Sequence, residues 1–417
     1  MPNSKQRLLA NIFSLSTLQI FNYILPLITL PYLVRVLGVE QFGLLAFAMS
    51  LVLYFGVLMD YGFNLSAARS VSLHRDEREK LCEILGAVYT SKLILMLLGF
   101  MIFGALLLAV ERFWEYRFIY LASFAVVAAQ TLFPVWFFQG IERLKFVTLI
   151  SVGSKTLFTC LLFVLVQTPA DAIWVPLLNA FGFALCAAVS LYIITRKMGI
   201  ALRPVSLQTL KTHLQDSHAI FVSNVAISLY TVSTTFILGL FTNNTVVGYY
   251  AAADRIIQAF KSLLMPLSQS IYPHISHKLK SSQEEALHFI RKSAKYLTLA
   301  LGGLSLFISI AAPWLVRILL GDGYEASVIL VQIMSPLPLI IGLSNLFGIQ
   351  TMVNFGKKEA FKKILWSAAM IGIALSFILV PLFAEIGSAI GVLITEIFVT
   401  LMMFLYLQKN GLEIVKR

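Results

Sequence analysis

The chain has 417 residues, of which 59% are hydrophobic and only 12% are charged, and its net charge is +12. A soluble domain carries about 25% charged residues, so much of this apolar side chain must face lipid rather than a core. The basic residues are spread through short segments between apolar stretches, which is typical of membrane topology and excludes a nucleic-acid partner.

Twelve windows along the chain are long and apolar enough to cross a bilayer, which requires about 20 residues each. The first window is too long for the apolar part of a removable signal peptide, so we expect it to be the first span. The seventh and eighth windows are the most polar, and we expect them to face a cavity. The windows are 12–33, 42–65, 84–108, 118–138, 146–166, 172–195, 219–240, 246–270, 297–316, 326–351, 364–383 and 388–407.

The distribution of Lys and Arg predicts the orientation of the spans. If the N-terminus is cytoplasmic, the cytoplasmic segments hold 24 of the 32 Lys and Arg residues and the opposite loops hold four. Such a bias is typical of membrane proteins, whose cytoplasmic loops are enriched in basic residues. The sequence therefore predicts a multi-pass protein of a cytoplasmic membrane with both termini in the cytoplasm.

The two halves of the chain resemble each other at an offset of about 205–215 residues. LGVEQFGLLAFA at 37–48 parallels FTNNTVVGYYAA at 241–252, which aligns Gly43 with Gly248. Two further pairs of segments follow in the same order. Parallel repeats of six spans are typical of transporters whose halves surround a central site. We therefore expect an all-α integral membrane protein with two six-helix lobes (1–200 and 219–417) around a central cavity, joined by a cytoplasmic linker at 201–218.

The sequence holds no enzyme motif. A Walker A loop, a G-x-S-x-G turn, an H-E-x-x-H helix and a C-x-x-C pair are all missing, and the predicted exoplasmic loops are too short to carry a catalytic face. The three cysteines lack metal-ligand spacing, and we expect free thiols. The sequence thus predicts a transporter without a cofactor, a metal site or catalytic residues.

Charged residues inside the spans are the candidates for function. A charge near the bilayer centre costs about 2.5–3.5 kcal/mol, so the charges that persist usually face protein or water. Basic residues outnumber acidic ones here, which favours an anionic cargo because Arg and Lys bind phosphate. The candidates for a phosphate and sugar cavity are Arg255, Lys261, Lys155, Lys92, Arg35 and Gln258, and those for ion coupling or pairing are Asp254, Asp60 and Glu396.

Helical spacing arranges some of these side chains in stripes. Asp254, Gln258 and Lys261 follow each other at i, i+4 and i+7 in the eighth span, with Arg255 about 100° further round. Ser and Thr residues flank Lys155 at the same spacing in the fifth span. A third polar stripe, in the seventh span, consists of Asn224, Ser228, Thr231 and Thr235.

Structural alternatives exist for most of these residues. Asp254 and Lys261 would then form an ion pair that only fixes helix packing. Lys92 would reach the membrane surface by extending its stem, and Asp60 would lie in the interface. The Ser and Thr stripes would join helices. Arg255 lies well within its span, so a structural alternative explains it least well.

The sequence also resembles a known family. The runs NYILPLITLPYLVRVLGVEQFGLLAFA at 22–48, PVWFFQGIERLKFVTLI at 134–150 and VGYYAAADRIIQAF at 247–260 are similar to Wzx-type polysaccharide flippases. These belong to a superfamily that also contains multidrug-and-toxin extruders and the peptidoglycan-precursor flippase. The ADR at 253–255 resembles that of the latter flippase, in which the Arg lines a cationic cavity; this supports Arg255. No motif supports Lys92, Lys155 or Glu396 in this way.

The resemblance implies a flippase of the bacterial inner membrane. Its cargo would be an undecaprenyl-diphosphate-linked oligosaccharide, such as an O-antigen repeat unit, moved from the cytoplasmic to the periplasmic leaflet by alternating access. H⁺ or Na⁺ is a candidate coupling ion, and membrane lipids and other polysaccharide-assembly membrane proteins are candidate partners. The alternatives are an ion-coupled multidrug or organic-cation antiporter of the same superfamily and a membrane polysaccharide polymerase.

Overall fold

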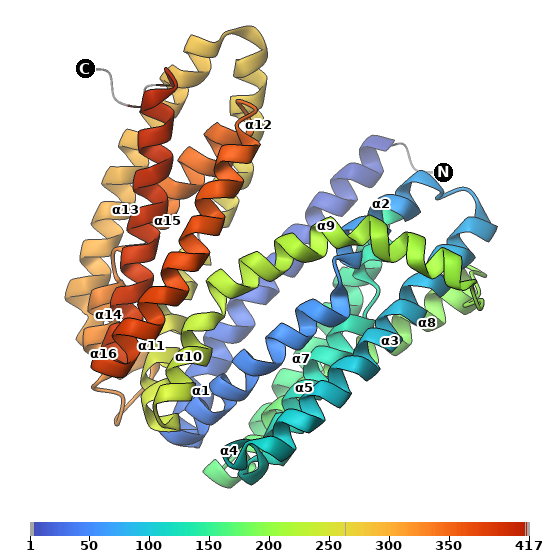
Figure 1. Ribbon diagram of the computed structural model, residues 1–417, viewed down its shortest axis with the longest axis horizontal. Helices are drawn as coiled ribbons and strands as arrows, with labels where there is room; N and C mark the ends of the chain where they lie inside the picture. Colours follow the sequence, from blue (N-terminus) through green and yellow to red (C-terminus); the bar gives the residue numbers. More distant parts are fainter. Residues whose placement is uncertain (1–3, 263, 413, 415–417) are drawn as a thin grey trace. The chain divides into compact units, whose positions relative to one another are not determined.

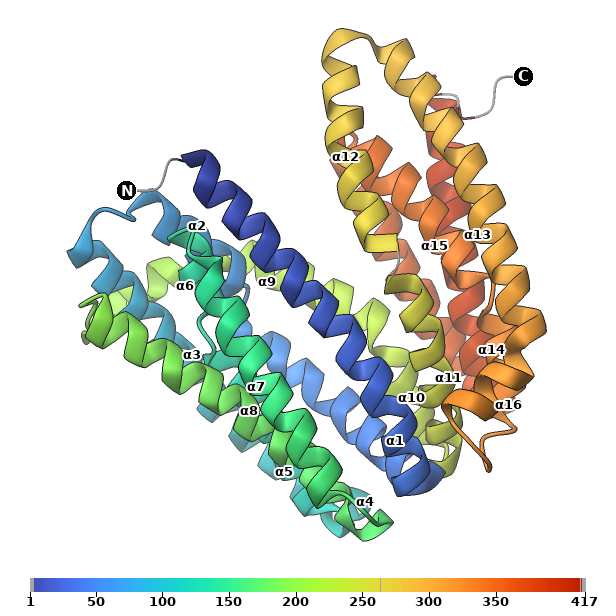
Figure 2. The ribbon, with the colours of Figure 1, turned by 180° about the vertical axis from the view of Figure 1, so that it is seen from behind.

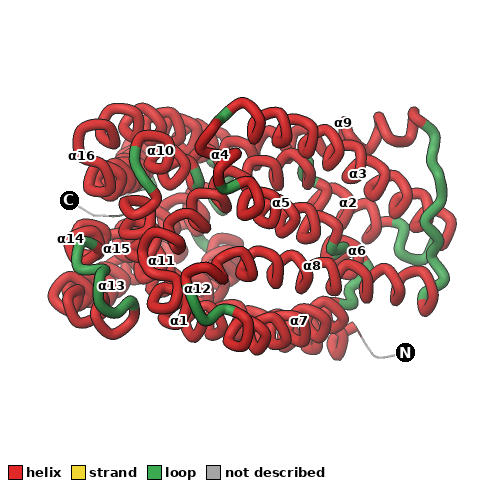
Figure 3. The backbone as a smooth tube through the Cα atoms, turned by 90° about the horizontal axis from the view of Figure 1, so that it is seen from below, coloured by secondary structure: helices red, strands yellow, loops and turns green. Residues whose placement is uncertain are grey.

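The structure of the protein is a computed structural model that describes residues 4–262, 264–412 and 414. Helices account for almost all of this part of the chain, and no strand occurs within it (Figures 1 and 3). The helices form two compact units. One comprises Met1–Leu37 and Phe47–Ser228, and the other comprises Gly38–Ala46 and Leu229–Arg417.

The first unit contains the helices of the N-terminal half. Within it α5 packs along α8, α7 packs along α8, and the short α2 and α6 lie against each other (Figure 2). Its helices are most of α1 (Ser4–Asp60), α2 (Phe63–Leu73), α3 (Arg78–Ala109), α4 (Glu111–Glu115), α5 (Arg117–Leu132), α6 (Val135–Gly140), α7 (Leu144–Leu165), η1 (Pro169–Ile173), α8 (Trp174–Tyr192), η2 (Ile193–Lys197) and most of α9 (Leu207–Thr231).

The second unit contains the helices of the C-terminal half. Here α10 and α15 pack against α16, and α11 and α13 both pack against α14. Its helices are α10 (Ser233–Phe241), α11 (Asn244–Ser262), α12 (Leu264–Ser281), α13 (Gln283–Leu319), α14 (Ser327–Met334), α15 (Leu337–Asn345), η3 (Leu346–Val353) and α16 (Lys358–Lys409).

The helices that are long and apolar enough to cross a membrane account for most of the twelve predicted spans, but α11 and α12, which carry the eighth window, are not among them. Eight helical segments are long and apolar enough to span a membrane, or nine when α9 and α10 are taken as one bent span. Helix α16 has 52 residues, about 80 Å, whereas a bilayer core is about 30 Å thick. The non-helical Ala384 divides α16, and Gly38 divides α1 in the same way, so each supplies two spans. All twelve predicted windows fall on helices.

Exposed apolar side chains confirm the membrane assignment. Leu97 on α3, Ile310 on α13 and Leu382 on α16 are each at least 60% exposed, and many other leucine, isoleucine and phenylalanine residues are exposed along the same helices. Water would not solvate so continuous an apolar surface, but lipid does. The protein is therefore an all-α, multi-pass integral membrane protein.

The region 201–218, predicted as a linker, is partly helical in the structure because α9 begins at Leu207. The first unit includes this region and continues to Ser228. In addition, residues 38–46 group with the second unit. The placement of two six-helix lobes at 1–200 and 219–417 stays a prediction.

The aromatic segment 135–140, the most distinctive run of the chain, is a structural core. Trp136, Phe137 and Phe138 are at most 1% exposed, and together they form α6. A Cβ on Gly140 would lie 2.6 Å from Cβ of Val71 on α2, so the absence of a side chain there permits the close packing of the two helices. The three aromatic side chains of this segment therefore stabilise the core of the first unit.

The two glycines aligned by the internal repeat lie against each other in the second unit. A Cβ on Gly43 would lie 2.6 Å from the Gly248 nitrogen and would overlap the Asn244 carbonyl oxygen. A Cβ on Gly248 would lie 2.8 Å from Val39 Cγ1 and would overlap the Val39 carbonyl oxygen. Equivalent positions of the two repeats thus make a reciprocal backbone contact, which we call the glycine contact.

Candidate functional site

Lys92 and Asp60 form a buried ion pair in the first unit. Lys92 Nζ lies 3.1 Å from Asp60 Oδ1 and donates a second hydrogen bond to the Thr131 carbonyl oxygen at 3.0 Å. Its side chain is 2% exposed and that of Asp60 is 19% exposed. Lys92 therefore does not extend to the membrane surface. The pair connects the end of α1, the middle of α3 and the end of α5.

A sharp corner in the chain positions Asp60. Tyr61 and Gly62 both have positive φ angles (47° and 81°), and they separate α1 from α2. The Tyr61 ring stacks on Phe221 of α9 with 4.4 Å between centroids, and its hydroxyl lies 3.1 Å from His218 Nδ1. The corner is thus held against α9 next to the ion pair.

Helix α11 carries the predicted stripe of the eighth span. Gln258 Nε2 lies 3.5 Å from Asp254 Oδ1, as the spacing of four residues predicts. Asp254 and Lys261 are half-buried, and Arg255 and Gln258 are exposed. None of the ion pairs found among the described residues involves Arg255 or Lys261. The α11 side chains therefore present basic groups that an anion can approach.

The three remaining predicted residues lie on separate helices. Arg35 is exposed on α1, three residues before the break at Gly38. Lys155 is half-buried on α7. Glu396 is half-buried on α16, where its carbonyl oxygen accepts a hydrogen bond from the Thr400 hydroxyl at 2.9 Å.

The described contacts join only some of the predicted residues. In the first unit Lys92 meets Asp60, and in the second unit Gln258 meets Asp254. The assignment of the individual residues to cargo binding or ion coupling stays a prediction.

The polar stripe of the fifth span packs against protein, and the polar stripe of the seventh span is interrupted. Ser151 and Thr159, which flank Lys155, are buried, so this stripe faces protein. Ser154 on the same helix donates a hydrogen bond to the Gly182 carbonyl oxygen at 2.7 Å and joins α7 to α8. The stripe of the seventh span is not continuous, because α9 ends at Thr231 and α10 begins at Ser233 with a bend of 50°.

A network of amide side chains in the second unit was not predicted. Ser268 on α12 donates a hydrogen bond to Asn345 Oδ1 at 2.7 Å, and Gln350 Nε2 donates to the Ser268 carbonyl oxygen at 3.0 Å. Gln350 belongs to η3, which is a π-helix, and such segments are frequent at functional sites. The signal for this network in the sequence is the pair of uncharged amide residues, Asn345 and Gln350, inside the tenth window.

Comparison with known proteins identifies the family. The family model described as "Polysaccharide biosynthesis protein" matches residues 8–279, which is more than half of the chain. The chain belongs to the polysaccharide biosynthesis protein family. A second model, described as "Lipid II flippase MurJ", matches residues 237–417. The predicted resemblance to polysaccharide flippases is therefore confirmed.

Two curated relatives of the chain carry the same name, "Putative O-antigen transporter". The one from Escherichia coli (strain K12) is 36% identical over 412 residues, covering 99% of each chain. The one from Shigella dysenteriae is 28% identical over 391 residues, covering 92% of this chain and 95% of the relative. Because the relatives are named as transporters, the predicted class of transporter rather than enzyme is confirmed.

Solved structures of transporters have the same fold. An inward-facing multidrug resistance MATE family transporter of the MOP superfamily aligns with a TM-score of 0.72 at 14% identity, covering 96% of this chain and 98% of that one. Lipid II flippase MurJ in an inward closed conformation aligns with a TM-score of 0.71 at 13% identity, covering 94% and 87%. At this level of identity, the likeness establishes the fold of the polysaccharide biosynthesis protein and not its cargo.

Proposed function

We propose that this protein is a flippase that moves an undecaprenyl-diphosphate-linked oligosaccharide, such as an O-antigen repeat unit, from the cytoplasmic to the periplasmic leaflet of the bacterial inner membrane. The relatives named as O-antigen transporters and the match to a lipid flippase model support this cargo class. The observation that carries the proposal is Arg255, an exposed guanidinium on α11, within the predicted eighth span, that makes no ion pair among the described residues.

The chemistry of the proposed cargo explains the excess of basic groups. A diphosphate with attached sugars cannot cross hydrocarbon unaided, whereas its lipid tail can stay in the bilayer. Arg255 and Lys261 would bind the diphosphate, because Arg forms paired hydrogen bonds to phosphate and Lys supplies a point charge. Gln258 would bind phosphate or sugar. Lys155, Lys92 and Arg35 are the further candidates for the cavity.

Alternating access is the proposed mechanism, with lobes at 1–200 and 219–417 opening in turn to each side of the membrane. The proposed orientation places both termini in the cytoplasm. An ion gradient would drive the cycle, with Asp254, Asp60 and Glu396 as the candidate groups for H⁺ or Na⁺. Collapse of the proton and sodium gradients in vesicles should slow translocation; an unchanged rate would contradict the coupling.

A multidrug or organic-cation antiporter is the second candidate, because the fold matches a multidrug transporter closely. A site for organic cations should be mainly acidic, and the intramembrane charges here are mainly basic. A drug-resistance assay on a deletion strain distinguishes the two functions. The flippase proposal predicts unchanged drug resistance and loss of surface polysaccharide.

Replacement of Arg255 by alanine should reduce complementation of a flippase-deficient strain at least tenfold, since a hydrogen bond to a charged group contributes about 1.5–3 kcal/mol. Arg255→Lys should retain part of the activity because the charge persists without the paired geometry. Surface polysaccharide is measured at equal abundance of membrane-inserted protein. Arg317→Ala, at the exposed end of α13, is the matched control. Normal polysaccharide in Arg255→Ala would remove this residue from the site.

A further inference from the structure

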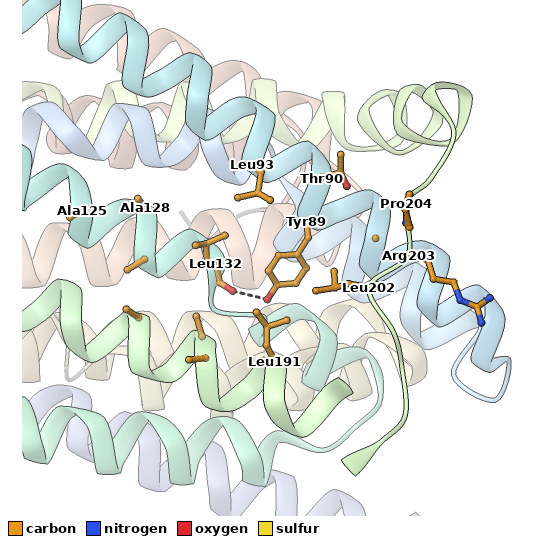
Figure 4. A pocket seen from close by; sticks show the side chains of 15 residues that line it. Tyr89, Thr90, Leu93, Ala125, Ala128, Leu132, Leu191, Leu202, Arg203 and Pro204 are labelled. Atoms are coloured by element: carbon orange, nitrogen blue, oxygen red, sulfur yellow. Dashed lines mark hydrogen bonds between the residues drawn. The ribbon is translucent and has the colours of Figure 1, made fainter. Parts of the chain in front are cut away.

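A large cavity lies in the first unit, and its lining does not include the predicted site residues. It is bounded by α3, α5 and α8 and by the segment 199–206 that follows η2, and its volume is about 830 Å³ (Figure 4). Ligand pockets have volumes of about 300–1,000 Å³, so this groove can hold a molecule of substantial size. We call it the α3–α5–α8 groove.

The groove is lined mainly by apolar side chains, and six of them are alanines. Ala125 and Ala128 of α5 and Ala184 and Ala188 of α8 line it, with Leu93 of α3. Tyr89 contributes its ring, because its hydroxyl donates a hydrogen bond to the Leu132 carbonyl oxygen at 2.8 Å (Figure 4). The lining therefore offers van der Waals contact and few polar groups.

One end of the groove is basic. Arg203 lies at this end, is exposed, and extends its guanidinium away from the apolar lining (Figure 4). The backbone of Arg203 is close to α3, where a Cβ on Gly86 would overlap the Arg203 carbonyl oxygen. Arg78 adds a second guanidinium at the same segment, since its Nε donates a hydrogen bond to the Gly199 carbonyl oxygen at 2.8 Å.

The groove opens onto the apolar surface of the helices that form it. Leu93, which lines the groove, is 51% exposed, and Leu97 one turn further along α3 is 60% exposed. Alkyl chains of the bilayer therefore have direct access to the groove. Basic pockets between membrane helices bind the head groups of anionic lipids.

We propose that the α3–α5–α8 groove binds an anionic membrane phospholipid, with an acyl chain against the alanines and the phosphate at Arg203. The complementarity is twofold, since the apolar lining matches an acyl chain and the Arg203 guanidinium at one end of the groove matches a phosphate. A helix of another protein is a poorer occupant, because the basic end has no role in helix packing. The proposal depends only on the membrane location of the chain and not on the identity of the cargo.

Native mass spectrometry of the full-length protein tests the proposal. Phosphatidylglycerol and phosphatidylcholine are offered to the detergent-solubilised protein, and retained lipid is counted. We expect selective retention of phosphatidylglycerol and a loss of about tenfold in Arg203→Glu, because a charge-assisted contact to phosphate is removed. Lys211→Glu is the matched control: an exposed residue on α9 that undergoes the same charge change but does not line the groove.

A second variant tests the apolar part. Ala188→Phe fills the groove from an exposed position, so folding should be unaffected and lipid retention should fall; Val189→Phe, next to it and outside the lining, should leave retention unchanged. Equal retention in Arg203→Glu and Lys211→Glu would overturn the proposal. Retention of an undecaprenyl phosphate without retention of phosphatidylglycerol would also overturn it. A dimer of the protein that Ala188→Phe dissociates would do the same, because the groove would then be an interface between two copies.

Discussion

Replacement of Gly43 or Gly248 by valine is expected to prevent accumulation of folded protein. The Cβ of either residue would overlap a carbonyl oxygen of the facing segment, and main-chain atoms cannot move aside as the end of a flexible side chain does. Overpacking usually costs about 1–3 kcal/mol and more where the backbone must shift. Either substitution forces apart the same two backbones. The loss of folding free energy should therefore be larger for valine than for alanine.

Fluorescence-detected size-exclusion chromatography of the membrane-extracted protein, with heating, measures the effect. Gly303→Ala is the matched control, because this glycine of α13 has no heavy atom within 4 Å of its added Cβ. Alanine is the better helix former by about 1 kcal/mol, so the control should be as stable as the parent or more so. If the Gly43→Val protein is monodisperse and as heat-resistant as the parent, the prediction is wrong. The two backbones at the glycine contact would then separate readily.

Removal of Lys92 is expected to have the second large effect. Methionine preserves the length of the side chain but leaves Asp60 without its cation, and the loss of one partner of a buried ion pair costs about 3–5 kcal/mol. The double variant Lys92→Met with Asp60→Asn should recover most of this loss, since no uncompensated charge remains. Thermal unfolding of the four proteins measures the coupling between the two residues.

An exposed ion pair on α3, with a similar distance between nitrogen and oxygen, provides the control. Lys80 Nζ lies 3.0 Å from Glu83 Oε2, but these side chains are 53% and 40% exposed, so Lys80→Met should cost at most about 1 kcal/mol. The double variant at positions 60 and 92 also separates structure from transport. If it is stable and inactive in complementation, the pair takes part in transport; if it is stable and active, the pair fixes helix packing.

Much of the fold was predictable because membrane insertion leaves a strong imprint on sequence. Every spanning helix requires an apolar run of fixed length, so the twelve windows fall on helices in the structure. The divisions of α1 at Gly38 and of α16 at Ala384 fall in the gaps between predicted windows, at 34–41 and 384–387. The windows do not indicate that a single residue makes each break, and the second involves a residue type that rarely adopts a positive φ. The grouping of residues 38–46 with the second unit was also beyond the sequence pattern.

The candidate site was predictable only where its contacts are local. Asp254 and Gln258 meet because they are four residues apart on one helix, a relation that spacing alone indicates. Lys92 meets Asp60 across 32 residues, and their contact depends on the corner at Tyr61 and on the position of α5. The amide network of Ser268, Asn345 and Gln350 likewise joins residues up to 82 positions apart.

The glycine contact has a consequence for the ancestry of the chain. Gly43 and Gly248 occupy equivalent places in the repeat, and each fills the space that a side chain on the other would need. A contact between equivalent surfaces is what two identical subunits form around a two-fold axis. The same contact would therefore be available to two separate copies of a half-length chain, so the repeat and the glycine contact together point to an origin by duplication and fusion.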